Sequence, residues 1–115
     1  PSLRGMCMEH GAFWVPSWLK SLDFTYGAYV PRREFVEKPS DTARRCLKFS
    51  PFAGEPVGWI IENTSPDMIC YASDYPHPEG GSDPIRKFEA TMEGCDEATM
   101  SKFYHGNMQA LMSLA

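Results

Sequence analysis

The residue best placed to do chemistry is Asp74, which directly follows a short apolar run at residues 67–73. A near-continuous apolar run of that length is typical of a strand covered on both faces of a parallel sheet. The C-terminal ends of such strands form the side of an α/β protein where active sites lie. A carboxylate there can bind a metal ion or take a proton from a metal-bound water. The competing interpretation is that Asp74 starts a turn and bonds its own backbone.

Three further groups could join that carboxylate in a site. Glu9 and His10 follow the apolar segment at residues 3–8, and His77 stands three residues beyond Asp74. In parallel α/β proteins the functional residues lie at the strand ends on one side of the sheet. We therefore expect at least one of Glu9 and His10 to face a pocket there. The alternative is that Glu9 forms an ion pair and His10 is solvated. His77 either orients a neighbouring carboxylate or is an exposed loop histidine.

The elements that position these residues form three strand–helix units. The spacing of apolar residues predicts a helix after each strand. Asp83 is predicted to cap the third helix, with Pro84 at its first position. The strands are predicted at residues 3–8, 45–49 and 67–73. The first helix has an apolar face of Trp14, Val15, Trp18, Leu19 and Leu22. The second helix lies within residues 55–63, and the third has an apolar face of Ile85, Phe88 and Met92.

The remaining segments are predicted as a loop and a helical tail. Residues 26–39 are predicted as a long loop, and residues 96–115 as two helical pieces broken near Gly106, the second capped by Asn107. Because no short hairpin turn joins two strands, the alternation of strands and helices predicts a parallel sheet. A full eight-unit barrel takes about 250 residues. We therefore expect three units to be the C-terminal part of something larger.

Composition and charge limit the classes of function. The chain has 115 residues, enough for one domain or part of one over residues 1–115, and a formal net charge of −4 without a basic run, which gives no case for nucleic acid. Its longest nearly apolar stretch, residues 68–72, is far below the roughly 20 residues that span a bilayer. Four widely spaced cysteines without a CxxC pair indicate reduced thiols and a cytoplasmic protein.

Three stretches of the sequence form recognisable motifs. Residues 71–79 read Tyr-Ala-Ser-Asp-Tyr-Pro-His-Pro-Glu, residues 9–16 read Glu-His-Gly-Ala-Phe-Trp-Val-Pro, and residues 105–111 read His-Gly-Asn-Met-Gln-Ala-Leu. They resemble, respectively, the last strand, the sixth strand with its helix, and the closing segment of the amidohydrolase-related family. That family is a metal-dependent TIM-barrel group, also called amidohydrolase 2. The motifs stand in the family's order and cover almost the whole chain.

The resemblance implies a fold and an activity. The fold would be α/β, the C-terminal βα units (about three) of a TIM-type (β/α)8 barrel that is incomplete in this chain. Asp74 would bind a divalent metal ion, most commonly zinc, or act as base on a metal-bound water. The reaction would be hydrolysis of a small molecule, or non-oxidative decarboxylation of an aromatic or enoic acid. Zinc lowers the pKa of its bound water to about 7, which creates a nucleophile at neutral pH.

The sequence departs from the family pattern in its histidines. The family's His-x-His pair of the first strand and its histidine of the fifth strand have no counterpart among His10, His77 and His105. Since a catalytic zinc usually has three protein ligands, this chain alone should bind metal poorly and be inactive. Family members carry either His or Glu at the end of the sixth strand, and the alignment here favours Glu9 over His10 for that place.

A second class of function stays open, a non-catalytic barrel-derived chain that acts through association with another chain. An exposed sheet edge on a partial barrel invites pairing with a further strand. The expected partners are therefore a small-molecule substrate and either the rest of the barrel or a second copy of the chain. Neither nucleic acid nor a membrane is expected.

Overall fold

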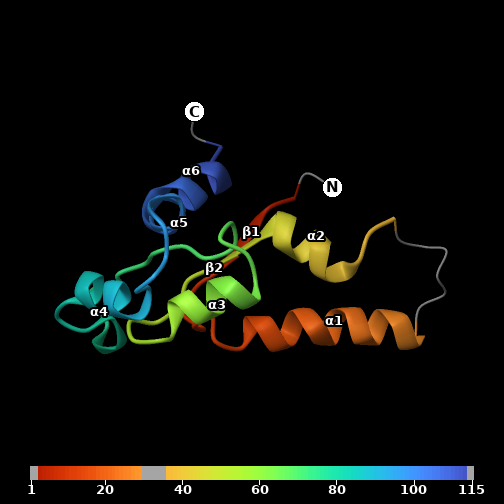
Figure 1. Cartoon of the computed structure of the whole chain (residues 1–115), viewed down its shortest axis with the longest axis horizontal. Helices are drawn as coiled ribbons and strands as arrows, with labels where there is room; N and C mark the ends of the chain where they lie inside the picture. The colour runs from red at the N-terminus through yellow and green to blue at the C-terminus, as the bar shows by residue number, and fades with distance from the viewer. Residues whose placement is uncertain (1–2, 30–35, 114–115) are drawn as a thin grey trace.

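A short parallel sheet lies between the helices of the fold (Figure 1). The computed structural model describes residues 3–29 and 36–113. Strands β1 (Gly5–Cys7) and β2 (Leu47–Phe49) pair in parallel, and a third extended segment (residues 69–73) joins β2 through a parallel bridge between Phe49 and Ile69. The predicted parallel sheet is confirmed, although the strands are shorter than predicted and the third is a bridge rather than a full strand.

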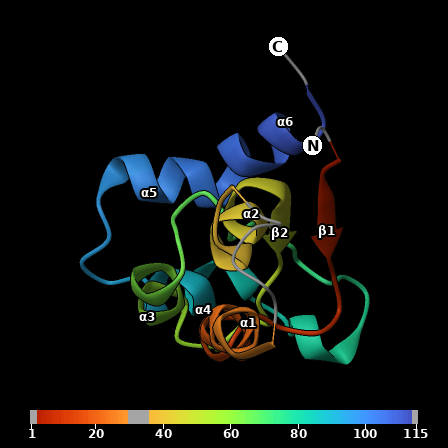
Figure 2. The ribbon, with the colours of Figure 1, turned by 90° about the vertical axis from the view of Figure 1, so that its right-hand side faces the viewer.

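Helices cover both sides of this sheet. They are α1 (Val15–Tyr29), α2 (Pro39–Cys46), α3 (Val57–Asn63), a 3-10 turn η1 (Pro78–Gly80), α4 (Pro84–Thr91), α5 (Glu97–Ser101), a π-helical turn η2 (Lys102–Gly106) and α6 (Asn107–Leu111). Helix α1 packs against α2 and α3, and α3 packs against α4. The C-terminal helices lie on the opposite side of the sheet from α1 (Figure 2). The strand–helix alternation is therefore confirmed.

The hydrophobic core forms where these helices meet the sheet. The predicted stripe of α4 is confirmed at Phe88 but wrong at Ile85, whose side chain is 51% exposed. The predicted cap is confirmed, since the Asp83 carboxylate accepts a hydrogen bond from the backbone N–H of Arg86. The side chains buried most deeply are those of Ala12, Val15, Leu19, Val57, Ile60, Met68, Ile69, Cys70, Phe88 and Phe103.

The predicted loop over residues 26–39 is wrong at both ends. Helix α1 continues to Tyr29 and α2 begins at Pro39, while residues 30–35 lie outside the described residues. Helix α2 also includes Arg45, which the sequence analysis placed in the second strand. The sequence of α2 is polar and has few apolar positions, so its periodicity did not reveal it.

Asp23 of α1 caps α2 from outside that helix. Its carboxylate accepts hydrogen bonds from the backbone N–H and the hydroxyl of Ser40, at 3.0 and 2.8 Å. The N-cap residue itself, Lys38, makes no side-chain cap. Burial alone would raise the pKa of Asp23, but the two hydrogen bonds from Ser40 and the positive charges of Lys38 and Arg44 together hold that pKa below its ordinary value. The first turn of α2 thus depends on its packing against α1.

The predicted break of the C-terminal helix near Gly106 is also wrong, because η2 links α5 to α6 without interruption. Within η2 the backbone N–H of Asn107 bonds the carbonyl of Lys102, five residues back. The carbonyl of Phe103, which an α-helix would have used, is released and accepts a hydrogen bond from the backbone N–H of Tyr71 at 2.9 Å. The π-helical turn therefore holds the third extended segment.

Asn107 has a structural role other than the predicted cap. Its side chain is buried, and its Nδ2 donates to the carbonyl oxygens of Pro66 and Ile69, at 2.7 and 2.9 Å. These bonds satisfy the backbone carbonyl of Ile69 and that of Pro66 in the turn just before it. The closing helix is thereby attached to the strand that leads to Asp74.

All four cysteines are free thiols, as predicted. Burial raises the pKa of Cys70 to about 11, so this thiol is unreactive at neutral pH. Among the helices of residues 3–29 and 36–113, none combines the length and the apolar character needed to cross a membrane.

Replacing Asn107 with Ala should destabilise the fold by about 1–3 kcal/mol, because it leaves the buried carbonyl of Ile69 and the partly buried carbonyl of Pro66 without this donor. Urea unfolding followed by circular dichroism measures this free energy. Gln109→Ala, at an exposed position of α6, is the matched control and should stay within about 0.5 kcal/mol of the parent. Equal stability of the two variants would contradict the assigned role of Asn107.

Replacing Asp23 with Ala should cost about 1 kcal/mol at pH 7, the usual effect of losing a helix cap. Because the pKa of Asp23 is lowered by folding, its contribution is present above about pH 4 and is lost as the pH falls further. The stability difference between parent and Asp23→Ala should therefore stay constant from pH 7 to about pH 4 and shrink as the pH falls below about 4. Unfolding curves across that range test it, and a difference that also stays constant below that pH would exclude this cap.

Candidate active site

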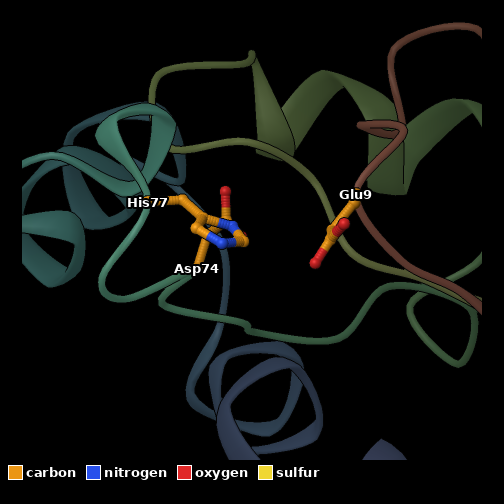
Figure 3. A group of neighbouring side chains, drawn as sticks. All are labelled: Glu9, Asp74 and His77. Carbon is orange, nitrogen blue, oxygen red and sulfur yellow. The ribbon is translucent and has the colours of Figure 1, made fainter.

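Three of the predicted residues meet at the C-terminal ends of the strands (Figure 3). Glu9 follows β1, while Asp74 and His77 follow the third extended segment. One oxygen or nitrogen atom from each of the three lies within 4.8 Å of the other two. In Figure 3, Glu9 lies across from the Asp74–His77 pair. Glu9 thus forms one cluster with two residues that lie more than 60 positions further along the chain, and the chemistry of the cluster is two carboxylates and an imidazole.

The cluster lines a cavity of about 290 Å³. The walls come from the chain just after β1, just after β2 and just after the third segment, which is the side predicted for a site. Its lining residues in the described chain are Met8, Glu9, Ser50, Pro51, Phe52, Ala72, Ser73, Asp74, Tyr75 and His77. The contribution of the loop after β2 was not predicted, although its place after a strand was a usable signal.

Asp74 is the most enclosed member of the cluster, with 15% of its side chain exposed against 54% for His77. Its Oδ1 lies 3.3 Å from Nδ1 of His77. Its Oδ2 is buried and has no hydrogen-bond partner among the described residues. A buried carboxylate oxygen without a donor is unfavourable, so this atom is available to a ligand.

The backbone around Asp74 is tightly constrained. Asp74 has a φ of 55°, in the left-handed region, and its carbonyl accepts a hydrogen bond from the N–H of His77 at 2.7 Å. The turn η1 lies directly over this point. A Cβ added at Gly80 would stand 2.2 Å from the carbonyl oxygen of Ser73, so only glycine allows this approach.

Glu9 also has left-handed backbone, with a φ of 61°. The strand end before it is fixed by a hydrogen bond from the N–H of Ser50 to the carbonyl of Cys7, at 3.2 Å. The left-handed turn directs the chain away from β1 immediately after Met8. Glu9 is exposed but borders the cavity, in agreement with the interpretation that favoured it over His10.

The other histidines lie outside the cluster. His10 is exposed, is absent from the described cavity lining, and its carbonyl accepts a hydrogen bond from Nε1 of Trp14 at 3.2 Å. His105 belongs to η2, where its Nε2 lies 3.2 Å from the hydroxyl of Ser101. The structure thus gathers Glu9, Asp74 and His77 and leaves His10 in solvent.

Comparisons with known proteins place the fold. No protein-family model and no curated protein sequence matches the chain. The crystal structure of an amidohydrolase from Mycobacterium avium subsp. paratuberculosis K-10 matches 96% of this chain with a TM-score of 0.81 and 24% sequence identity. The matched region is 28% of that chain, so this chain spans little more than a quarter of its neighbour's length. The predicted amidohydrolase-like fold is confirmed at this level.

Gly80→Ala should destabilise the protein by about 1–3 kcal/mol, because the added methyl group forces η1 away from the Ser73 carbonyl. Gly27→Ala is the control, since no atom lies within 4 Å of its added Cβ on helix α1. That change should be neutral or should stabilise by up to about 1 kcal/mol. Urea unfolding of both variants tests this, and a neutral Gly80→Ala would show that η1 does not press on the strand end.

Proposed function

We propose that this chain contributes to a metal-dependent hydrolase of the amidohydrolase type, acting on a small molecule. The observation that carries the proposal is the enclosed Asp74 carboxylate, with one oxygen lacking a donor and with Glu9 and His77 beside it. The amidohydrolase-like fold supports the same reading. We propose further that the three strand–helix units belong to a (β/α)8 barrel whose active-site end is this cavity.

The residues present suit a divalent cation. Carboxylate oxygens and an imidazole nitrogen are ligands that zinc accepts, and the open Oδ2 of Asp74 is the atom best placed to coordinate. A bound zinc ion would supply a water whose pKa is about 7. Asp74 holds the ion or takes a proton at Oδ2, while His77 orients the carboxylate through Oδ1. Glu9 adds a second negative charge that favours a cation.

The cavity favours hydrolysis over decarboxylation. Among the described residues that line it, none is Lys or Arg, while two are carboxylates. A substrate carboxylate would meet Glu9 and Asp74 without a basic side chain on this side of the cavity. The remaining walls include apolar groups from Met8, Pro51 and Phe52. We therefore propose a neutral or cationic substrate with an apolar portion, such as an amide, ester or lactone.

A free sheet edge supports the part of this proposal that assigns the chain to a larger barrel, and it is also the feature through which a non-catalytic barrel-derived chain would associate with another chain. No segment within residues 3–29 and 36–113 pairs with the outer edge of β1. An apolar cavity of about 530 Å³ lies between the starts of β1 and β2 and the helices α1 and α2. Its apolar lining includes Leu3, Trp18, Leu22, Pro39, Ala43 and Leu47. We propose that additional strand–helix units cover this surface, as barrel closure requires. The free cysteines support a cytoplasmic location for the whole protein.

Asp74→Asn should lower kcat by roughly 10²–10⁴-fold, the usual contribution of a positioned acid or base, with little loss of fold. Activity of the full-length protein on esters, amides and lactones, together with its metal content, measures the effect. Asp67→Asn is the matched control, because Asp67 is half-exposed and pairs with Lys102 away from the cavity. Retained activity in Asp74→Asn would remove this carboxylate from the mechanism.

A further inference from the structure

We propose that Glu55 is a positioning residue of this site, whose carboxylate fixes the loop that carries Glu9 opposite Asp74 and His77. The inference rests on the proposed function, because it assigns Glu9 a place in that site. Glu55 lies between β2 and α3, outside the described cavity lining, so it acts through other residues.

The Glu55 carboxylate accepts three backbone hydrogen bonds from two separate loops. Its Oε2 accepts from the N–H groups of Ala12 and Phe52, at 2.8 and 3.0 Å, and its Oε1 accepts from the N–H of Phe13 at 3.3 Å. Ala12 is completely buried. Hydrogen bonds to an ionised acceptor are stronger than neutral ones. One side chain therefore joins the loop after β1 to the loop after β2.

The two loops joined in this way are walls of the cavity. Phe52 lines it directly, and the turn it occupies is closed by a hydrogen bond from the Glu55 N–H to the Phe52 carbonyl at 3.1 Å. The other loop leaves β1 at Cys7 and carries Glu9. Both sides of the Glu9 loop are thus attached to the segment at residues 50–55, before it by Ser50 and after it by Glu55.

These attachments leave Glu9 in a short segment between two fixed points. Cys7 is fixed by Ser50 and Ala12 is fixed by Glu55, so residues 8–11 span the interval between two anchored points. Gly11 lets the carboxylate come close, since it has a φ of 62° and an added Cβ would stand 2.5 Å from Oε1 of Glu55. Losing Glu55 would release the second anchor and let the Glu9 side chain move.

Glu55 also supplies a charge that α1 lacks. The first turn of α1 contains no acidic residue. The amide groups of Ala12 and Phe13 just precede that helix and point at the Glu55 carboxylate. A negative charge at this end complements the helix dipole. The Glu55 carboxylate therefore fixes both the start of α1 and the loop that carries Glu9.

The test is made in the full-length protein, because residues 1–115 alone are expected to bind metal poorly. It compares Glu55→Ala and Glu55→Gln with the parent, and uses Glu62→Ala, an exposed position of α3, as the matched control. NMR of the metal-free protein follows amide exchange at Ala12 and Phe13 and the carboxyl carbon signal of Glu9. Titration with Co²⁺ alone gives the metal affinity and the visible spectrum. Urea unfolding shows whether each variant is folded.

In Glu55→Ala we expect amide exchange at Ala12 to be at least about 10-fold faster and the Glu9 signal to shift, while the His77 ring signals stay in place. Affinity for Co²⁺ should fall by roughly 10–100-fold, the usual effect of removing a group that orients a metal ligand. Glu55→Gln keeps one acceptor oxygen, so its amide exchange rate and its Co²⁺ affinity should lie between those of Glu55→Ala and the parent. Glu62→Ala should match the parent.

Unchanged Glu9 signals with parent-like Co²⁺ affinity would overturn the role of Glu55. If Glu55→Ala does not fold, Glu55→Gln decides by the same two measurements. Failure of the parent to bind Co²⁺ would contradict the proposed function instead. In that event the shift of the Glu9 carboxyl signal still decides whether Glu55 fixes this loop.

Discussion

The segment that ends at Asp74 depends on hydrogen bonds from the C-terminal helix. In the described chain it has one β-bridge to the sheet, too little to fix an extended strand. The buried amide of Asn107 and the carbonyl released by the π-helical turn supply the remaining contacts. The π-helical turn, usually an unfavourable distortion, frees the Phe103 carbonyl to accept a hydrogen bond from the N–H of Tyr71. Without it, the cavity would lose the wall that carries Asp74.

The two sides of the candidate site are held by unrelated means. On one side, η1 and the Asn107 helix hold Asp74 and His77 through backbone contacts. On the other, a carboxylate outside the cavity, that of Glu55, joins two loops and places Glu9. Glu9 and Asp74 both have left-handed backbone, which turns the chain sharply at the end of the strand before each of them. The site is therefore built from two rigid halves that face each other.

The sequence allowed prediction of those features that follow from local pattern. An apolar run followed by Asp74, and a second run followed by Glu9, predicted where the cavity lies, whereas the sequence left His77 open between a group that orients a carboxylate and an exposed loop histidine. Their catalytic roles stay predictions. Asn107 was misread as a cap, because the cap preference of Asn is local whereas its partners lie 38 and 41 residues away. Glu55 gave no signal, since its partners are backbone groups of two loops that only the fold brings together. Helix α2 was missed because its polar sequence shows no apolar periodicity and because the carboxylate that caps it, that of Asp23, comes from another helix.

The order in which the chain folds follows from the parallel register of its strands. Gly5 pairs with Leu47, so β1 stays without a neighbour until two helices and a further strand have formed. Closing loops of this length delays the formation of non-local contacts. The carboxylates at the strand ends are consequently assembled late, after the local helices. On the ribosome, the edge of β1 that faces β2 stays uncovered until the chain up to Phe49 has been made, and it is open to non-native pairing during that interval.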